Sequence, residues 1–149
     1  SNVDGGTGTG QGVSLTIPLG TMTATIASAS FDDAGSDSST FGGKVSMAAG
    51  AGTLVVGLET SSNDSATHEG EAYSISYSTT LGGAAVAVGY SGYDANSTTS
   101  SRTDVTMSQS IGGGASIFAE FQNLTGAGVA AEGNSTSESV VAVGTSVSF

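Results

Sequence analysis

Two glutamates and one lysine fall, by strand alternation, on faces made otherwise of small polar residues. Glu59, Glu120 and Lys44 each alternate with the apolar positions of their own segments. Carboxylates on a wall that faces water attract cations by simple electrostatics. The alternative is that the two glutamates are solvated or paired with Lys44. Catalysis by a carboxylate pair needs an approach within about 5 to 10 Å, and positions so far apart in sequence do not predict one.

Two clusters of acidic residues lie in segments rich in Ser, Thr and Asn. Ca2+ takes several oxygen ligands, so each cluster is a candidate Ca2+ site, although neither has the D-x-[DN]-x-[DN]-G spacing of an EF-hand loop. The alternative is that these carboxylates are solvated loop charge. We expect no other metal or cofactor. The first cluster is Asp32, Asp33 and Asp37, and the second is Asp64, Glu69 and Glu71.

Other kinds of chemistry lack the residues that they need. His68 is the one histidine and there is no cysteine, which disfavours a transition-metal site and a hydrolytic triad. The glycine-rich tract at residues 5–12 lacks the lysine and the helix of a phosphate-binding loop. A formal net charge of -11 repels nucleic acid. We therefore expect neither an enzyme nor a nucleic-acid-binding protein.

The composition favours strands over helices. The chain of 149 residues has 24 Gly, one Pro and no Trp, and its helix-forming charged residues are few. No segment approaches the roughly 20 consecutive apolar residues of a membrane-spanning helix. Residues 1–12 read as a flexible glycine-rich lead-in, and residues 13–149 as strands.

Period-two alternation recurs along the chain, and two kinds of connection take turns between the alternating runs. Residues 13–19 and 139–149 are the clearest runs, with apolar and small polar side chains on opposite faces. About nine strands of roughly eight to eleven residues result, the length that a tilted strand needs to cross a bilayer. The tight, glycine-rich connections are residues 18–21, 49–52, 81–83 and 111–114. The long, acidic connections are residues 31–40, 61–70, 93–101 and 124–138.

Aromatic residues collect near the ends of the expected strands. Rings in a membrane barrel gather where headgroups meet hydrocarbon, whereas those of a β-sandwich lie in its core. Of these rings, only Phe118 falls in the middle of a strand on the polar face. The sequence therefore predicts an all-β fold, a transmembrane antiparallel β-barrel. Its expected interface aromatics are Tyr73, Tyr90 and Phe121 near the long connections, and Tyr77 and Phe149 near the opposite ends.

The carboxy-terminal sequence resembles that of a known family. The stretch QSIGGGASIFAEFQNL at residues 109–124, followed by SVVAVGTSVSF at residues 139–149, is similar to the end of Gram-negative general porins, particularly the alphaproteobacterial type. YSISYSTTLGGAAVAVGYSGYD at residues 73–94 resembles an earlier hairpin of the same family. The resemblance implies a trimeric, water-filled barrel of about sixteen strands in the outer membrane, made by a chain about twice as long as this one.

Three interpretations follow from these patterns. The first is the carboxy-terminal half of a porin: a channel for passive diffusion of ions and small hydrophilic solutes, leaning toward cations. We expect its partners to be membrane lipid, lipopolysaccharide that divalent ions bridge to the acidic loops, and two further copies in a homotrimer. The second is a small outer-membrane barrel closed by eight strands over residues 21–149. The third is a secreted structural or adhesive β-protein without a pore.

Overall fold

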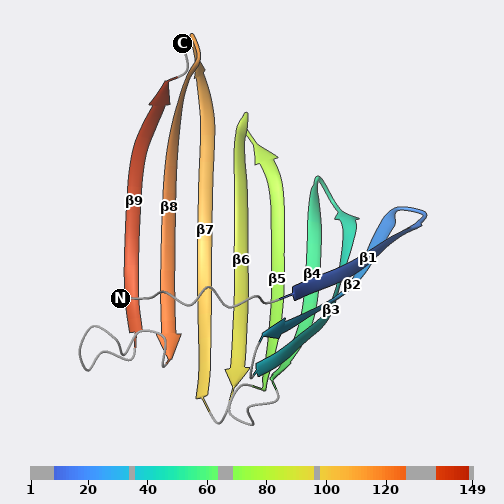
Figure 1. Cartoon of the computed structure of the whole chain (residues 1–149). Helices are drawn as coiled ribbons and strands as arrows, with labels where there is room; N and C mark the ends of the chain where they lie inside the picture. Colours follow the sequence, from blue (N-terminus) through green and yellow to red (C-terminus); the bar gives the residue numbers. More distant parts are fainter. Residues whose placement is uncertain (1–8, 34–35, 64–68, 96–97, 127–136, 148–149) are drawn as a thin grey trace.

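The chain forms one antiparallel β-sheet in a computed structural model that describes residues 9–33, 36–63, 69–95, 98–126 and 137–147 (Figure 1). The order of strands in the sheet is the order in the chain, so every connection joins neighbours. The expected all-β fold and the expected number of strands are confirmed. The nine strands are β1 Thr9–Leu19, β2 Met22–Asp33, β3 Ser36–Ala49, β4 Gly52–Asn63, β5 Gly70–Leu81, β6 Ala84–Ala95, β7 Thr98–Gly112, β8 Ala115–Gly126 and β9 Ser137–Val147.

Two-residue turns with glycine join the strands at one end of the sheet. Gly20, Gly50 and Gly82 have φ values of 69°, 60° and 58°, a left-handed conformation that tight hairpins require and that glycine adopts without steric cost. In the β7–β8 hairpin the register shifts between Ser110 and Gly112, which is the signature of a β-bulge. The turns are residues 20–21, 50–51, 82–83 and 113–114.

Most of the large apolar side chains of the nine strands share one face, which we call the convex face. Val45, Val56 and Ile75 form one row of it, each opposite the next across β3, β4 and β5. Their side chains meet no second layer among the described residues: Val56 is 37% exposed, Ile75 47% and Val143 78%. In the described part of the chain, Ala84 is the only buried hydrophobic residue. The sheet therefore has an apolar surface but no apolar interior.

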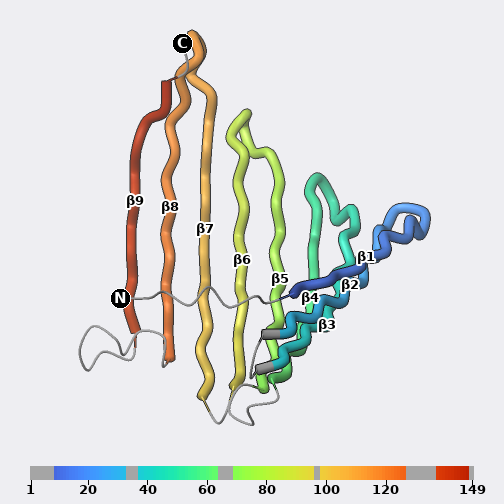
Figure 2. The backbone as a smooth tube through the Cα atoms, viewed as in Figure 1, coloured from blue at the N-terminus to red at the C-terminus, as the bar shows by residue number. Residues whose placement is uncertain are grey.

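The opposite face, which we call the concave face, carries small and hydroxyl-bearing residues. Thr16 lies opposite Thr25 with their hydroxyl oxygens 3.3 Å apart, and Gly57 lies opposite Ser74, which lies opposite Ser91. Figure 2 shows the curvature of the sheet, with β5–β9 upright and β1–β3 turned across the view. Antiparallel pairing keeps the two faces separate because residues directly opposite each other point to the same side.

The strands extend further than the sequence predicts. β1 begins at Thr9, so residues 9–12, expected in the flexible lead-in, pair with β2; residues 1–8 lie outside the described residues. Strand lengths are 11 to 15 residues instead of eight to eleven. β2 ends at Asp33 and β3 begins at Ser36, and β6 ends at Ala95 and β7 begins at Thr98. Most of the expected long connections at residues 31–40 and 93–101 is therefore strand, and the other two, at residues 61–70 and 124–138, are strand at their two ends.

The sheet is open over the described residues. A closed eight-stranded barrel would require β9 to pair with β2, but β9 pairs with β8, and β2 pairs with β1 and β3. The eight-stranded alternative is therefore wrong for this structure. The nine-stranded interpretation holds, with β1 and β9 as the two edges. The described part of the chain holds no helix with the length and apolar character to span a bilayer.

Candidate functional site

A hollow of about 890 Å³ lies on the concave face, over the parts of β1 to β8 nearest the long connections. We call it the concave groove. Its floor consists of small side chains because glycine, serine, threonine and alanine occupy most positions of that face. Hydroxyl groups can bond to water at such a surface, whereas their burial without partners would be costly. Residues of the floor include Ser14, Thr25, Ala27, Gly57, Ser74 and Ser91.

Lys44 and Glu59 both line this groove, as their strand parity predicts. Lys44 lies opposite Gly57, and Glu59 lies opposite Gly42, so the two charges are diagonal neighbours on β3 and β4. A Cβ atom added at Gly42 would lie 3.3 Å from Glu59 Cβ and Cγ. Glycine at position 42 therefore leaves the space that the glutamate occupies. No ion pair joins Lys44 to Glu59 among the described residues, and both residues are exposed to solvent.

An ion pair that the sequence did not predict lies on the same face of β7. Arg102 Nε donates to Asp104 Oδ1 at 2.9 Å, with 47% and 31% of the two side chains exposed. Arg102 lines the groove and lies opposite Ser91. Asp104 lies across Gly89, where a Cβ atom would contact its carboxylate. The signal was the spacing of two residues, which puts both charges on one face of a strand.

Both basic residues of the chain belong to one row of the concave face. The register runs from Lys44 to Gly57, Ser74, Ser91 and Arg102 across β3 to β7. Between Lys44 and Arg102 this row contains only glycine and serine. A cation therefore stands at each side of a stretch of small residues.

Glu120 also faces the concave side, but the structure does not bring it to the groove. It lies opposite Thr106 and Ala142, nearer the glycine turns. Gln122 Nε2 donates to Glu120 Oε1 at 3.1 Å. The sequence grouped Glu120 with Glu59, and the structure separates them by several strands and along the sheet. They cannot act as a pair of carboxylates.

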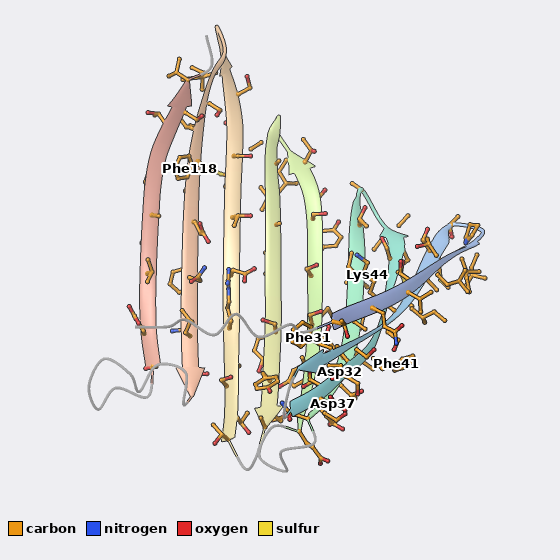
Figure 3. All side chains as sticks on the ribbon, viewed as in Figure 1. Phe31, Asp32, Asp37, Phe41, Lys44 and Phe118 are labelled. Carbon is orange, nitrogen blue, oxygen red and sulfur yellow. The ribbon has the colours of Figure 1, made fainter. Side chains whose placement is uncertain are left out.

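The acidic clusters lie at the end of the sheet opposite the glycine turns. Asp32 and Asp37 are cross-strand partners on β2 and β3 (Figure 3), and Glu71 lies opposite Asp94. Nothing is described of the Asp33 side chain, and Asp64 and His68 lie outside the described residues. Among the side chains described, no group of three or more His, Cys, Asp or Glu converges to hold a metal ion. Ca2+ binding stays a prediction.

The four expected interface aromatics that the structure describes all lie on the convex face. The rings of Tyr73 and Tyr90 are 6.0 Å apart at 40°, and the Tyr77 hydroxyl donates to the Ala49 carbonyl at 3.1 Å. Phe121 lies opposite Val105 and Val141. Phe149 lies outside the described residues.

Two aromatic rings near the long connections face the concave side, in addition to Phe118. Phe31 lies opposite Gly10, and Tyr93 lies opposite Ala72 and lines the groove. Figure 3 shows Phe31 and Phe41 on neighbouring strands, and the register puts them on opposite faces. Phe31, Phe41 and Tyr93 all lie near strand ends, and that nearness does not distinguish the two faces. The face on which a ring lies depends on whether its position along the strand is odd or even, because successive side chains point to opposite faces.

A curved antiparallel sheet with an apolar convex face and a hydroxyl-lined concave face is the arrangement found in the walls of outer-membrane β-barrels. The fold of this chain is of that class. No family model matches the sequence, and no curated protein matches it.

Solved structures support the assignment of the fold. The anion-selective porin of Comamonas acidovorans has a TM-score of 0.67 and 16% identity, over 78% of this chain and 38% of that one. A porin refined at 1.8 Å resolution has a TM-score of 0.70 and 15% identity, over 90% of this chain and 50% of that one. OccK3 (OpdO) of Pseudomonas aeruginosa has a TM-score of 0.64 and 14% identity, over 90% of this chain and 49% of that one. This chain therefore spans half or less of the length of these three porins, and identities this low show the fold alone.

Proposed function

We propose that this sheet is part of the wall of a water-filled channel in the outer membrane of a Gram-negative bacterium. Ions and small hydrophilic solutes diffuse through the channel passively, without catalysis. The observation that carries the proposal is the separation of a mainly apolar face from a face of mainly small and hydroxyl-bearing residues, which continues across all nine strands. Lipid can cover the convex face, and water can cover the hydroxyl groups of the concave face.

The sheet also has the dimensions for this role. A tilted strand crosses the hydrocarbon core with about 9 to 11 residues, and the strands here have 11 to 15. The additional residues carry Ser and Thr on both faces and Asp on the convex face, which suits strand ends that project into water. The four described interface aromatics fit the headgroup region in this arrangement.

We further propose that the channel leans toward cations. Three carboxylates of the concave face, Glu59, Glu120 and Glu138, stand against one free cation among the described residues, Lys44, because Asp104 neutralises Arg102. Negative charge on the wall of a water-filled passage raises the local concentration of cations. The similar fold of an anion-selective porin does not decide the sign for this chain, since the wall charges differ from protein to protein.

Reconstitution into planar bilayers tests both proposals. We expect discrete conductance steps, and a reversal potential in a KCl gradient that has the sign of K+ preference. Glu59→Gln should reduce that preference, whereas the matched change Glu71→Gln, on the convex face at a strand end, should leave it unchanged. The assay is run on this chain, refolded in detergent and inserted into the bilayer. Lipid-embedded protein that stays silent contradicts the channel.

The finer features of the resemblance belong to the same proposal. We infer that the sheet corresponds to the carboxy-terminal half of a general porin of the alphaproteobacterial type, supported by the sequence at residues 109–124 and 139–149. A homotrimer, and contact with lipopolysaccharide through Ca2+ at the acidic strand ends, complete the proposed assembly. Native mass spectrometry in detergent, with and without Ca2+, measures the number of copies.

A further inference from the structure

Three side chains of the concave groove have no partner within the described part of the chain. Lys44, Glu59 and Tyr93 all line the groove, and none of them makes a hydrogen bond or an ion pair with another described residue. The other cation of the groove, Arg102, is held by Asp104 at 2.9 Å. An ammonium group, a carboxylate and a phenol are therefore available to a solute that enters the groove.

Tyr93 lies along the floor of the groove, over a glycine of the neighbouring strand. It is the one tyrosine of the chain on the concave face. A Cβ atom added at Gly70, on β5, would contact the Tyr93 hydroxyl and would lie 2.6 Å and 2.7 Å from ring atoms Cζ and Cε2. Gly70 is buried, whereas Tyr93 is 43% exposed. The ring therefore covers the glycine and leaves the rest of its surface open to the groove.

The register places a negative charge between a positive charge and this ring. Glu59 is a diagonal neighbour of Lys44 on β3 and of Gly70, the glycine under the ring, on β5. Diagonal neighbours in an antiparallel sheet are about 7–8 Å apart, which is within reach of long side chains. The floor among these groups is made of small residues, which leave space for a solute: Gly57, Ala72, Ser74 and Ser91.

This order of groups fits a small molecule that carries charges of both signs. An ammonium group is attracted by a carboxylate and by the face of an aromatic ring, and a carboxylate accepts hydrogen bonds from a lysine ammonium. A solute with a single charge would meet a like charge at Lys44 or at Glu59, whereas a zwitterion meets an opposite charge at each. A neutral sugar can bond to the hydroxyl groups, but it leaves both charges without a counter-charge.

We propose that this part of the groove binds small zwitterions whose ammonium and carboxylate groups are close together, the class of amino acids and betaines. The ammonium group lies between Glu59 and the Tyr93 ring, and the carboxylate contacts Lys44. The inference deepens the proposed function, on which it rests for the access of solutes to the groove. All three contacts are open to water, so we expect a dissociation constant on the order of 1 to 10 mM.

Three solutes of nearly the same shape provide a direct test. Glycine betaine carries both charges, choline has a hydroxymethyl group in place of the carboxylate, and 3,3-dimethylbutanoate has a carbon atom in place of the charged nitrogen. Saturation-transfer NMR on the chain refolded in a polyoxyethylene detergent measures each dissociation constant, with micelles alone as the blank. We expect glycine betaine to bind about fivefold more tightly than either of the others, since a unit charge at 4 Å in water is worth about that factor. Equal or tighter binding of choline, 3,3-dimethylbutanoate or glucose overturns the proposal.

Single substitutions assign each contact. Lys44→Gln should weaken glycine betaine about fivefold without weakening choline, and Glu59→Gln should weaken glycine betaine by the same factor without weakening 3,3-dimethylbutanoate. Tyr93→Leu should weaken glycine betaine and choline about two- to fivefold, whereas Tyr93→Phe keeps the ring and should keep the binding. The matched control is Glu120→Gln, on the concave face outside the groove, which should leave every dissociation constant unchanged.

The NMR measurement requires no pore, so it separates this inference from the proposed channel. Glycine betaine that binds the unmodified chain and all the variants alike overturns the inference, because its site then lies elsewhere. The expected binding pattern in a chain that does not conduct would contradict the channel alone. Conductance without binding of glycine betaine would support the channel and overturn the inference.

Discussion

Aromatic rings in this sheet lie across glycines of the neighbouring strand. Tyr73 lies across Gly92 on the convex face, and Phe118 lies across Gly144 on the concave face, where an added Cβ atom would contact the ring. Glycine leaves a gap in a strand, and a cross-strand ring fills it while protecting the backbone hydrogen bonds. These pairs fix the register at positions where small residues alone would allow it to slip.

Replacing Gly92 by alanine should therefore destabilise the sheet. The new methyl group and the Tyr73 ring would occupy the same space, and relief of such an overlap costs about 1–3 kcal/mol. Unfolding by urea in lipid vesicles measures the loss. Gly12→Ala is the control, because its added Cβ meets neighbours only at 3.5 Å or more. In a Tyr73→Ala background the change at Gly92 should cost little; an equal cost in both backgrounds would show that the ring is not the cause.

The Arg102–Asp104 ion pair should set part of the wall charge. Arg102→Gln removes a cation from the groove and leaves the Asp104 carboxylate without its 2.9 Å partner. Preference for K+ over Cl- should rise, by at most about fivefold, since a unit charge at 4 Å in water is worth about 1 kcal/mol. Reversal potentials of the channel in planar bilayers measure this ratio. A fall in the ratio would mean that Arg102 acts on selectivity in some other way than through its charge.

At the scale of the strand, neighbouring residues meet opposite surroundings. Val143 is on the convex face and Ala142 on the concave face of β9. Val143→Lys should destabilise the protein in lipid by about 2–4 kcal/mol if position 143 lies near the middle of the bilayer, whereas Ala142→Lys should cost far less because it meets water. The comparison uses one strand and one new side chain. Similar costs at the two positions would contradict lipid contact on the convex face.

The alternation of apolar and polar residues along the sequence predicted the strands and their faces, but not where the strands end. Around Ser39 and Ser62 both faces are polar, so alternation carries no signal, yet the backbone ladder continues and the two hydroxyl oxygens lie 2.8 Å apart. The segment looked like a loop because its composition is that of loops. Hydroxyl pairs of this kind stabilise a strand in water without any apolar contact.

The candidate site was predictable to the same extent. Lys44 and Glu59 follow from parity within strongly alternating runs. The Arg102–Asp104 pair does not, because the faces of β7 are defined by pairing with β6 and β8, and residues 98–104 of that strand hold no large apolar side chain. The row that joins Lys44 to Arg102 depends on register over five strands, information that no local pattern contains.

The molecule as a whole is a single curved layer. A soluble sheet protein hides its apolar face beneath a second layer, and in the described residues nothing covers the convex face. We expect the protein to aggregate without an amphiphile, and to be monodisperse with a β-type circular dichroism spectrum in detergent. Analytical ultracentrifugation measures both conditions. A folded, detergent-free monomer would favour the secreted structural alternative.

The glycine turns give the sheet two very different ends. None of the four turns contains an ionisable residue, whereas the other end holds Asp32, Asp37, Glu71 and Asp94. Moving a carboxylate through hydrocarbon costs much free energy. A glycine hairpin that crosses the bilayer core carries no charged side chain with it. If the sheet enters a preformed vesicle without assistance, the turns lead, and the acidic rim remains on the side from which the protein was added. Lipid alone would then impose a single orientation, with no targeting machinery required.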